Sequence, residues 1–215
     1  MLRLASVPIA KINGHVVNQH SVEPLFRQDL HIHTTWSDGD PAVVPEQTVA
    51  LVAGLQHAET IGISDHFELL IRDGYEGYAR AVRGAGLRLG TEVNGEAWVE
   101  PAAELPFDYY VYHCFDTEAD YRGAERLLAT ARPVIIAHPH VLDTDLERVP
   151  AGCLVEINNR YISRCDWRGY YGPHVSRFDF VLSSDAHQPH WLNQTVARRV
   201  AAELGVRERL LFATD

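Results

Sequence analysis

The sequence has no apolar run near the roughly 20 residues that a helix needs to cross a bilayer, so we expect no membrane partner. Its N-terminus lacks the long apolar core of a secretory signal peptide. Only three cysteines are present, Cys114, Cys153 and Cys165, and their spacing matches no paired pattern. This argues against a disulfide framework and favours free thiols in a reducing compartment. We therefore expect a cytoplasmic protein.

Basic residues are also in short supply, because 19 Lys and Arg stand against 29 Asp and Glu, a formal net charge of −10. A broad nucleic-acid-binding surface needs clustered Lys and Arg, so this balance argues against a long nucleic acid as partner but not against a short oligonucleotide. Internal repeats and low-complexity segments are absent, and 215 residues most simply form one main domain. Histidine, in contrast, is abundant: the 12 imidazoles are potential metal ligands.

The most informative segment is His31-Ile32-His33, followed by Asp38-Gly39. Residues i and i+2 of a strand point to the same face, so the two imidazoles can bind one cation together. Asp38 lies in a turn that can reach the same cation or its neighbour. Alone, two histidines at this spacing are equally consistent with a solvated strand face.

Further chemistry-bearing residues follow other short apolar runs. They occur in Ser64-Asp65-His66, Thr91-Glu92, Tyr112-His113, Ala137-His138-Pro139-His140 and Ser184-Asp185-Ala186-His187. Together with the first segment, they predict a metal site assembled from the ends of many strands.

Strand-like runs alternate with helical stretches along the chain. Apolar residues recur at helical spacing in Pro45 to Glu59, in Thr117 to Ala131, which opens on a capping residue, and in Asn193 to Leu204, which Gly205 stops. The predicted strands span residues 28–32, 60–64, 87–92, 109–113, 134–138, 153–157 and 180–183. This alternation predicts an α/β fold with parallel connections. Ligands contributed by nearly every strand favour a distorted TIM-like barrel of about seven β/α units, with the active site at the C-terminal ends of the strands.

Residues 1–28 are expected to form an N-terminal extension, and residues 29–215 the main domain. Asn13-Gly14 suits a type I′ turn, so the extension is predicted to contain a β-hairpin. A hairpin that covers the barrel is favoured over a catalytic role.

The ordered set of motifs between residues 29 and 190 resembles the polymerase and histidinol phosphatase (PHP) superfamily, and most closely the PHP domain attached to bacterial family X DNA polymerases. The resemblance implies a distorted seven-unit barrel with three divalent metal ions (Zn, Mn or Fe) for phosphoester hydrolysis. It implies that His31, His33, Glu92 and Asp185 hold the first metal. Glu92 would bridge to a second metal held with His113 and His138, and a third metal would take Asp38, His66 and His187.

Several residues beside these ligands have two interpretations. Asp65 is expected to orient a ligand rather than to bind metal. His140 and His187 are candidate general acids, although His140 could equally lie on the surface. Glu156 either supports the site or is a buried, paired structural acid. Arg160 and Arg164 follow a predicted strand and are expected to bind the substrate phosphate, with surface ion pairs as the alternative.

The leading functional hypothesis is a metal-dependent phosphatase or phosphodiesterase that acts on a small phosphorylated metabolite or nucleotide through metal-activated water. A stand-alone 3′-5′ exonuclease or oligonucleotide phosphodiesterase ranks second, because the charge disfavours a long strand. A non-catalytic binding domain ranks last, because every motif position is filled. The sequence does not specify the oligomeric state.

Overall fold

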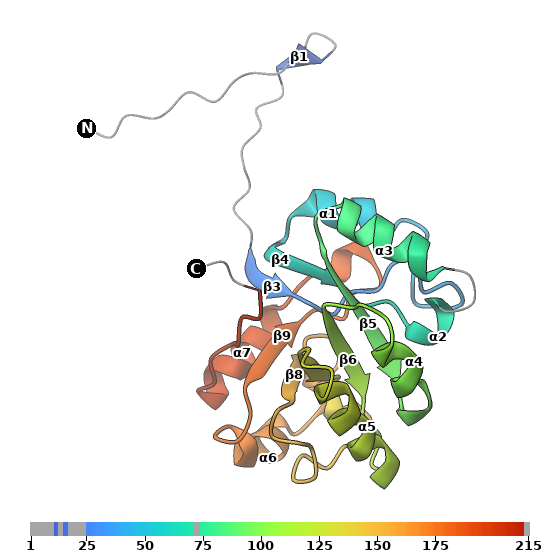
Figure 1. The fold of residues 1–215 in the computed structure, drawn as a ribbon. Coiled ribbons are helices and arrows are strands. Elements are labelled where there is room, and N and C mark those ends of the chain that lie inside the picture. The colour runs from blue at the N-terminus through green and yellow to red at the C-terminus, as the bar shows by residue number, and fades with distance from the viewer. Residues whose placement is uncertain (1–10, 13–14, 17–24, 71–73, 213–215) are drawn as a thin grey trace.

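The computed structural model describes residues 11–12, 15–16, 25–70 and 74–212. Its centre is a sheet of seven strands in the order β3-β4-β5-β6-β7-β8-β9, and every neighbouring pair is parallel. The strands are β3 (Phe26–Asp29), β4 (Ala58–Ile63), β5 (Arg88–Asn94), β6 (Tyr109–His113), β7 (Val134–Ile136), β8 (Leu154–Asn158) and β9 (Phe180–Ser183). The sheet curls into a nearly closed TIM-like barrel, as the alternation in the sequence predicts (Figure 1).

Helices connect the strands and pack on the outside of the barrel (Figure 1). They are α1 (Val49–Leu55), α2 (Phe67–Leu70), α3 (Tyr75–Gly84), α4 (Val99–Ala103), α5 (Glu118–Leu128), α6 (Trp167–Tyr171) and α7 (Thr195–Leu204). Short 3-10 turns lie at Glu96–Trp98, Pro139–Val141, Ile162–Arg164, Gly172–His174 and Pro189–Trp191. None of the helices in the described part of the chain has the length and apolar character needed to cross a membrane.

Local sequence signals explain several of these boundaries. Thr117 begins α5 by accepting a hydrogen bond from the backbone N–H of Asp120, and Gly205 ends α7 with a φ of 72°. The first predicted helix is shorter than expected. It begins after the capping residue Thr48 and ends at Leu55, because Gln56 takes the left-handed conformation and the chain then enters β4.

The first and last strands close the barrel through an isolated backbone bridge and one side chain rather than through a full ladder. Ile32 forms a parallel bridge with Ala186, and the N–H of His33 donates to the carbonyl of Ala186 over 2.9 Å. Gln194 lies across the remaining seam and donates from Nε2 to the carbonyls of Gln28 (2.8 Å) and Leu182 (3.2 Å). Because the seam is closed at this end, the residues that follow β3 and β9 come together.

At the other end of the seam, the C-terminal segment occupies the place of an eighth strand. Glu208 bridges to Phe180 of β9, and the side chain of Gln28 donates to the carbonyl of Arg209 and accepts from the N–H of Leu211. Leu211 also packs against the interior of the barrel.

Tyr109 fills much of that interior. Its hydroxyl donates to the carbonyl of Leu30 over 2.7 Å, and the ring is fully buried. The ring of Tyr109 fits because β4 and β5 have glycine beside it. A Cβ at Gly62 or Gly90 would lie 2.3 Å or 2.2 Å from Tyr109 atoms. The interior is therefore packed with side chains and is not a channel.

Successive residues of β6 point alternately into the barrel and outward to the helices, so this strand contributes to two buried apolar clusters. Tyr109 and Val111 belong to the interior cluster, whereas Tyr110 and Tyr112 pack under the helices. The next residue on the inward side is His113, at the C-terminal end of the strand.

The N-terminal segment contains two short strands, β1 (Lys11–Ile12) and β2 (His15–Val16), which pair antiparallel. The predicted turn residues Asn13 and Gly14 lie outside the described residues. Since the barrel begins with Phe26, its first strand starts slightly before the predicted boundary at residue 28.

Candidate metal centre

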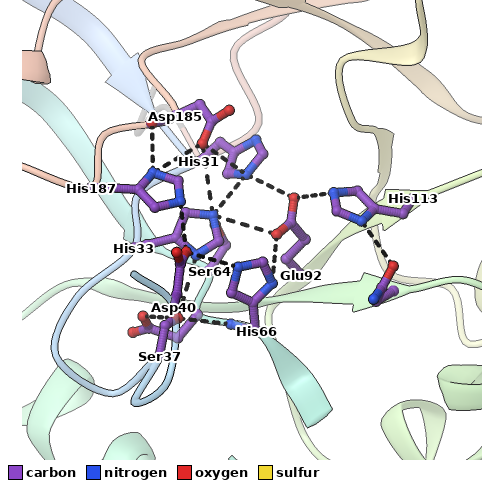
Figure 2. Close-up of polar contacts among 12 residues, drawn as sticks. His31, His33, Ser37, Asp40, Ser64, His66, Glu92, His113, Asp185 and His187 are labelled. Carbon is purple, nitrogen blue, oxygen red and sulfur yellow. Dashed lines mark hydrogen bonds and ion pairs between the residues drawn. The ribbon is translucent and has the colours of Figure 1, made fainter. Parts of the chain in front are cut away.

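The predicted metal ligands other than Asp38 lie at or near the C-terminal ends of the barrel strands. Parallel strands bring these ends to one rim, where histidines and carboxylates face one another (Figure 2). A cavity of about 220 Å³ opens there. Its lining residues are His33, Asp40, His66, Glu92, His113, His138, Arg160, Tyr161, Asp185 and His187.

Glu92 lies at the centre of the cluster and is 1% exposed. Its Oε1 is 3.0 Å from Nε2 of His31 and 2.6 Å from Nε2 of His113. Its Oε2 is 2.9 Å from Nδ1 of His66 and 3.4 Å from Nε2 of His33. The two oxygens thus face different imidazoles, which is the arrangement needed for a carboxylate that bridges two cations.

The contacts around Glu92 do not have the directions of hydrogen bonds. Within the described structure, buried Oε1 accepts no hydrogen bond, although Nε2 of His113 is only 2.6 Å away. Nε2 of His31 and Nε2 of His33 also face each other at 3.1 Å. Ring nitrogens and a carboxylate oxygen converge at close range without hydrogen-bond geometry, so the donor atoms fit bound cations.

Three groups of donor atoms are close enough to hold a metal ion. They are His33, Asp40, His66 and His187; His31, Glu92 and His138; and His31, His33 and Asp185. These mixtures of imidazole and carboxylate suit Zn, Mn or Fe. His113 belongs to none of the three groups, but it contacts Glu92 and lies 3.2 Å from His138 through Nε2.

Neighbouring groups orient most of these imidazoles. Nδ1 of His31 contacts Glu156, Nδ1 of His113 contacts the side-chain oxygen of Asn94, and Nδ1 of His187 contacts the carbonyl of Asp185. In each ring Nε2 is then left to face the cluster. Such contacts fix the tautomer and hold the ring in position for a metal.

Glu156 is the most extensively bonded of these supporting groups. Its Oε1 contacts Nδ1 of His31 at 2.7 Å and accepts from the hydroxyl of Ser183. Its Oε2 accepts from the N–H of His138 at 2.6 Å and from Nδ2 of Asn158 at 3.0 Å. Burial disfavours the charged form, but His31 and the hydrogen bonds outweigh it and lower the pKa of Glu156 to about 2. Glu156 is both buried and paired, and its partners are site residues.

The carboxylates in turn change the protonation of the imidazoles. Burial disfavours the charged form of His31, but Glu156, Asp185 and Glu92 outweigh it and raise the pKa of His31 well above its ordinary value. Burial likewise opposes protonation of His66, whereas Glu92 and Asp40 raise its pKa to about 10. A bound cation would therefore compete with protons for the same nitrogens.

The loop after His33 requires a correction to the predicted ligand. Asp38, the predicted ligand, is exposed. Asp40 instead contacts Nε2 of His66 at 3.3 Å and Nε2 of His187 at 3.0 Å (Figure 2). Both aspartates lie in one turn, in which the N–H of Asp40 donates to the carbonyl of Ser37 at 3.0 Å, and Gly39 between them has a φ of 107°. The chain reverses at this glycine, a conformation that favours Gly, and the second carboxylate is the one that returns to the cluster.

Asp65 supports this loop from inside. Its Oδ1 accepts from the N–H of Thr34 and the hydroxyl of Ser37, both at 2.6 Å, and its Oδ2 accepts from the hydroxyl of Thr34 at 2.7 Å. Burial raises the pKa of Asp65 to about 6 against these hydrogen bonds. The carbonyl of the same residue accepts from the N–H of Glu92 at 3.1 Å, so Asp65 links the loop to the central carboxylate.

Two site residues have left-handed backbone conformations although they are not glycine. His138 has a φ of 24° and Asp185 a φ of 53°. Such conformations cost energy and persist where surrounding contacts hold them. Here the N–H of His138 donates to Glu156, and Nδ2 of Asn158 donates to Oδ2 of Asp185 at 3.1 Å.

Asn158 is a supporting residue to which the sequence analysis gave no role. Besides its donations to Glu156 and Asp185, its Oδ1 accepts from the backbone N–H groups of Arg160 (2.9 Å) and Tyr161 (3.3 Å). It therefore fixes the turn after β8. The signal was its spacing, because residues 156 and 158 share the inward face of one strand.

The two predicted phosphate-binding arginines occupy different places. Nη1 of Arg160 lies at the cluster, 3.2 Å from Nδ1 of His187 and 3.5 Å from Oδ1 of Asp185. Its guanidinium is 4.9 Å from the ring centres of both Tyr161 and Trp191. Arg164 is exposed, lies over Tyr161 at 5.6 Å and does not line the small cavity.

The two candidate general acids are also separated. His187 is 3% exposed and lies within the cluster, facing Asp40. Nδ1 of His140 contacts the hydroxyl of Tyr171 at 3.0 Å, and His140 does not line the small cavity. Burial lowers the pKa of His140, which favours its neutral form.

Comparisons with known proteins give little beyond this geometry. The chain matches no protein-family model and no curated protein. Among solved structures it is similar to a truncated form of 3-deoxy-D-arabino-heptulosonate 7-phosphate synthase from Thermotoga maritima. That likeness has a TM-score of 0.40 and 11% sequence identity, and it covers 94% of this chain and 95% of the other.

Proposed function

We propose that the protein is a metal-dependent phosphoesterase that hydrolyses a small phosphorylated metabolite or nucleotide. The observation that carries the proposal is the buried carboxylate of Glu92, whose two oxygens contact different imidazoles at 2.6 to 3.4 Å without hydrogen-bond geometry at Oε1. The resemblance of the motifs to the PHP superfamily supports the same activity. We propose two to three divalent ions as cofactors, with Zn, Mn and Fe as candidates.

The three groups of donor atoms support a proposed place for each ion. His31, His33 and Asp185 would hold one, and His31, Glu92 and His138 would hold a second next to it, with His113 close by. The third would be held by His33, Asp40, His66 and His187. In such a centre, divalent cations supply activation of water and neutralisation of phosphoryl charge.

The chain's own groups supply the remaining requirements for phosphoryl transfer. Arg160 presents Nη1 at the edge of the cluster, where a guanidinium can bind a phosphoryl oxygen and orient the ester. Tyr161 and Trp191 hold that guanidinium between them. In a centre that holds only the first two ions, His187 is the candidate to donate a proton to the leaving oxygen, because it adjoins Arg160 and lines the cavity. As a ligand of the third ion it would have no proton to donate.

Small substrates fit the charge of the molecule better than long strands. The net charge of −10 surrounds a cleft that bound cations would make locally positive. A long nucleic acid would have to cross the acidic surround beyond a Debye length of about 8 Å at physiological salt. We therefore propose small phosphoesters as substrates, with short oligonucleotides as the alternative class.

The test is a comparison of kcat/KM for purified, Mn- or Zn-loaded protein on phosphomonoesters, cyclic nucleotides and a short single-stranded DNA at matched salt. We expect the small esters to be turned over best. Arg160→Ala should raise KM for them without loss of metal, because it removes a phosphate contact and not a ligand. A strong preference for the oligonucleotide would favour the exonuclease, and absence of hydrolysis in every metal-loaded sample would refute the proposal.

A further inference from the structure

A second cavity of about 540 Å³ adjoins the metal centre. Arg160 and Tyr161 line both cavities and form the wall between them. The larger cavity extends from this wall to Trp191 and to the N-terminal end of α7, where Thr195 and Val196 line it. A substrate whose phosphoryl group occupies the metal centre can therefore extend past Arg160 into this space.

The lining of this cavity differs in charge from the rest of the molecule. It includes Arg160, Arg164 and His190, and none of its ten described lining residues is Asp or Glu. The whole chain has a net charge of −10. Arg160 pairs with Asp185 at 3.5 Å, whereas Arg164 has no carboxylate partner among the described residues. The N-terminal end of α7 adds the positive end of a helix dipole.

Ser184 gives the cavity an unused hydrogen-bonding group. The residue is 1% exposed and lines the cavity, and its buried hydroxyl has no hydrogen-bond partner among the described residues. Buried hydroxyl groups are normally paired, because an unpaired one is costly. A ligand in the cavity would supply the missing partner.

The walls around this hydroxyl are already held in place without a ligand. Oδ1 of Asn159 accepts from the N–H groups of Val196 (2.9 Å) and Ala197 (3.1 Å), and this fixes the start of α7. Arg160 lies against the rings of Tyr161 and Trp191. The cavity is therefore a built site whose donors include the Ser184 hydroxyl and the arginine side chains.

We propose that this cavity binds a second anionic group of the substrate, so that the preferred substrate is a phosphoester with a further phosphate or carboxylate. Arg164 and the Ser184 hydroxyl bind the second anion, while Arg160 is shared with the reacting phosphoryl group. This inference rests on the proposed phosphoesterase function for the place of the first phosphate. It adds a substrate class that the metal centre alone does not specify.

The test separates binding from turnover. Binding to metal-loaded protein is measured for alkyl monophosphonates, alkane-α,ω-bisphosphonates and ω-phosphonocarboxylates of about three to six carbons. We expect the bisphosphonate or the phosphonocarboxylate of one length to bind about tenfold or more tightly than the monophosphonate, as one charge-assisted hydrogen bond provides. Which of the two gains more identifies the second anion as phosphate or carboxylate. The matching alkanediol monophosphates and bisphosphates then give the ratio of kcat/KM.

Arg164→Gln and Ser184→Ala should each reduce the preference for the doubly charged ligand. Arg168→Gln is the matched control, since it removes one positive charge four residues along, from an exposed side chain outside the cavity that pairs with Glu203. Equal binding of singly and doubly charged ligands at every length, or the same loss of preference in Arg168→Gln, would overturn the inference. Selective binding without hydrolysis of any ester would instead refute the phosphoesterase function and leave the anion site standing.

Discussion

Replacing Glu156 by Gln tests whether this carboxylate positions the metal ligands. Each of its four partners presents or can present a proton: Nδ1 of His31, the N–H of His138, Nδ2 of Asn158 and the hydroxyl of Ser183. A glutamine must turn its own NH₂ toward some of these donors, so at least one buried hydrogen bond is lost. The loss is expected to destabilise the metal-free protein by about 3 kcal/mol.

The pKa of Glu156 gives a similar magnitude by a separate route. It falls from an ordinary value of 4.5 to about 2, a difference worth about 3 kcal/mol. Because the folded-state pKa is the lower one, this stability is fully present above about pH 4.5 and is lost as the pH falls toward 2. The difference between wild type and Glu156→Gln in urea unfolding should therefore shrink over that range.

Metal titration supplies the second measurement on Glu156→Gln. The affinity for Mn or Zn should fall by about 10- to 100-fold, because His31 and His138 lose the group that orients them. Glu208→Gln is the control. Glu208 lies on the C-terminal segment, away from the metal centre, and its largely buried carboxylate pairs with Arg198 of α7. Unchanged metal affinity in Glu156→Gln, with a stability difference that does not vary with pH, would refute the positioning role.

Three further predictions concern other parts of the molecule. Asp40→Asn should lose about one metal equivalent in elemental analysis and Asp38→Asn none, and the reverse result would restore the original ligand prediction. Metal binding at pH 8 should release at least one proton, since the pKa of His66 is about 10, and metal affinity should fall as the pH is lowered. Calorimetry in buffers of different ionisation enthalpy measures the proton release. Binding without proton release would contradict the assignment of His66 as a ligand. Gly90→Ala should destabilise the fold by about 3 kcal/mol in urea, because its Cβ would lie 2.2 Å from the ring of Tyr109, and Tyr109→Leu in the same chain should recover part of the loss.

Much of the fold follows from the sequence because short strand-like runs alternate with helical stretches along the chain. The strands at 109–113 and 180–183 have the predicted bounds. The helix predicted for 45–59 is too long because periodicity does not reveal that Gln56 adopts a left-handed conformation. The closure of the seam by Gln194 was also unpredictable, since it depends on contacts between residues about 166 positions apart.

The site shows the same division between local pattern and tertiary contact. Spacing was enough to select His31 and His33, because a strand places alternate residues on one face. It was not enough to choose between Asp38 and Asp40, because the choice depends on the φ of the glycine between them. The spacing of Asn158 from Glu156 places it on the inward face of the strand, but spacing alone does not show which groups an asparagine side chain bonds.

The most direct test of the central claim is a metal titration of chelator-stripped protein, with hydrolysis of a small phosphomonoester followed in the same samples. Activity should rise with added Mn or Zn and level off at two to three equivalents per chain. Glu92→Gln should bind fewer equivalents and lose most of the activity, since it weakens the carboxylate that both halves of the cluster share. Hydrolysis that does not depend on metal, or full metal content and activity in Glu92→Gln, would contradict the account.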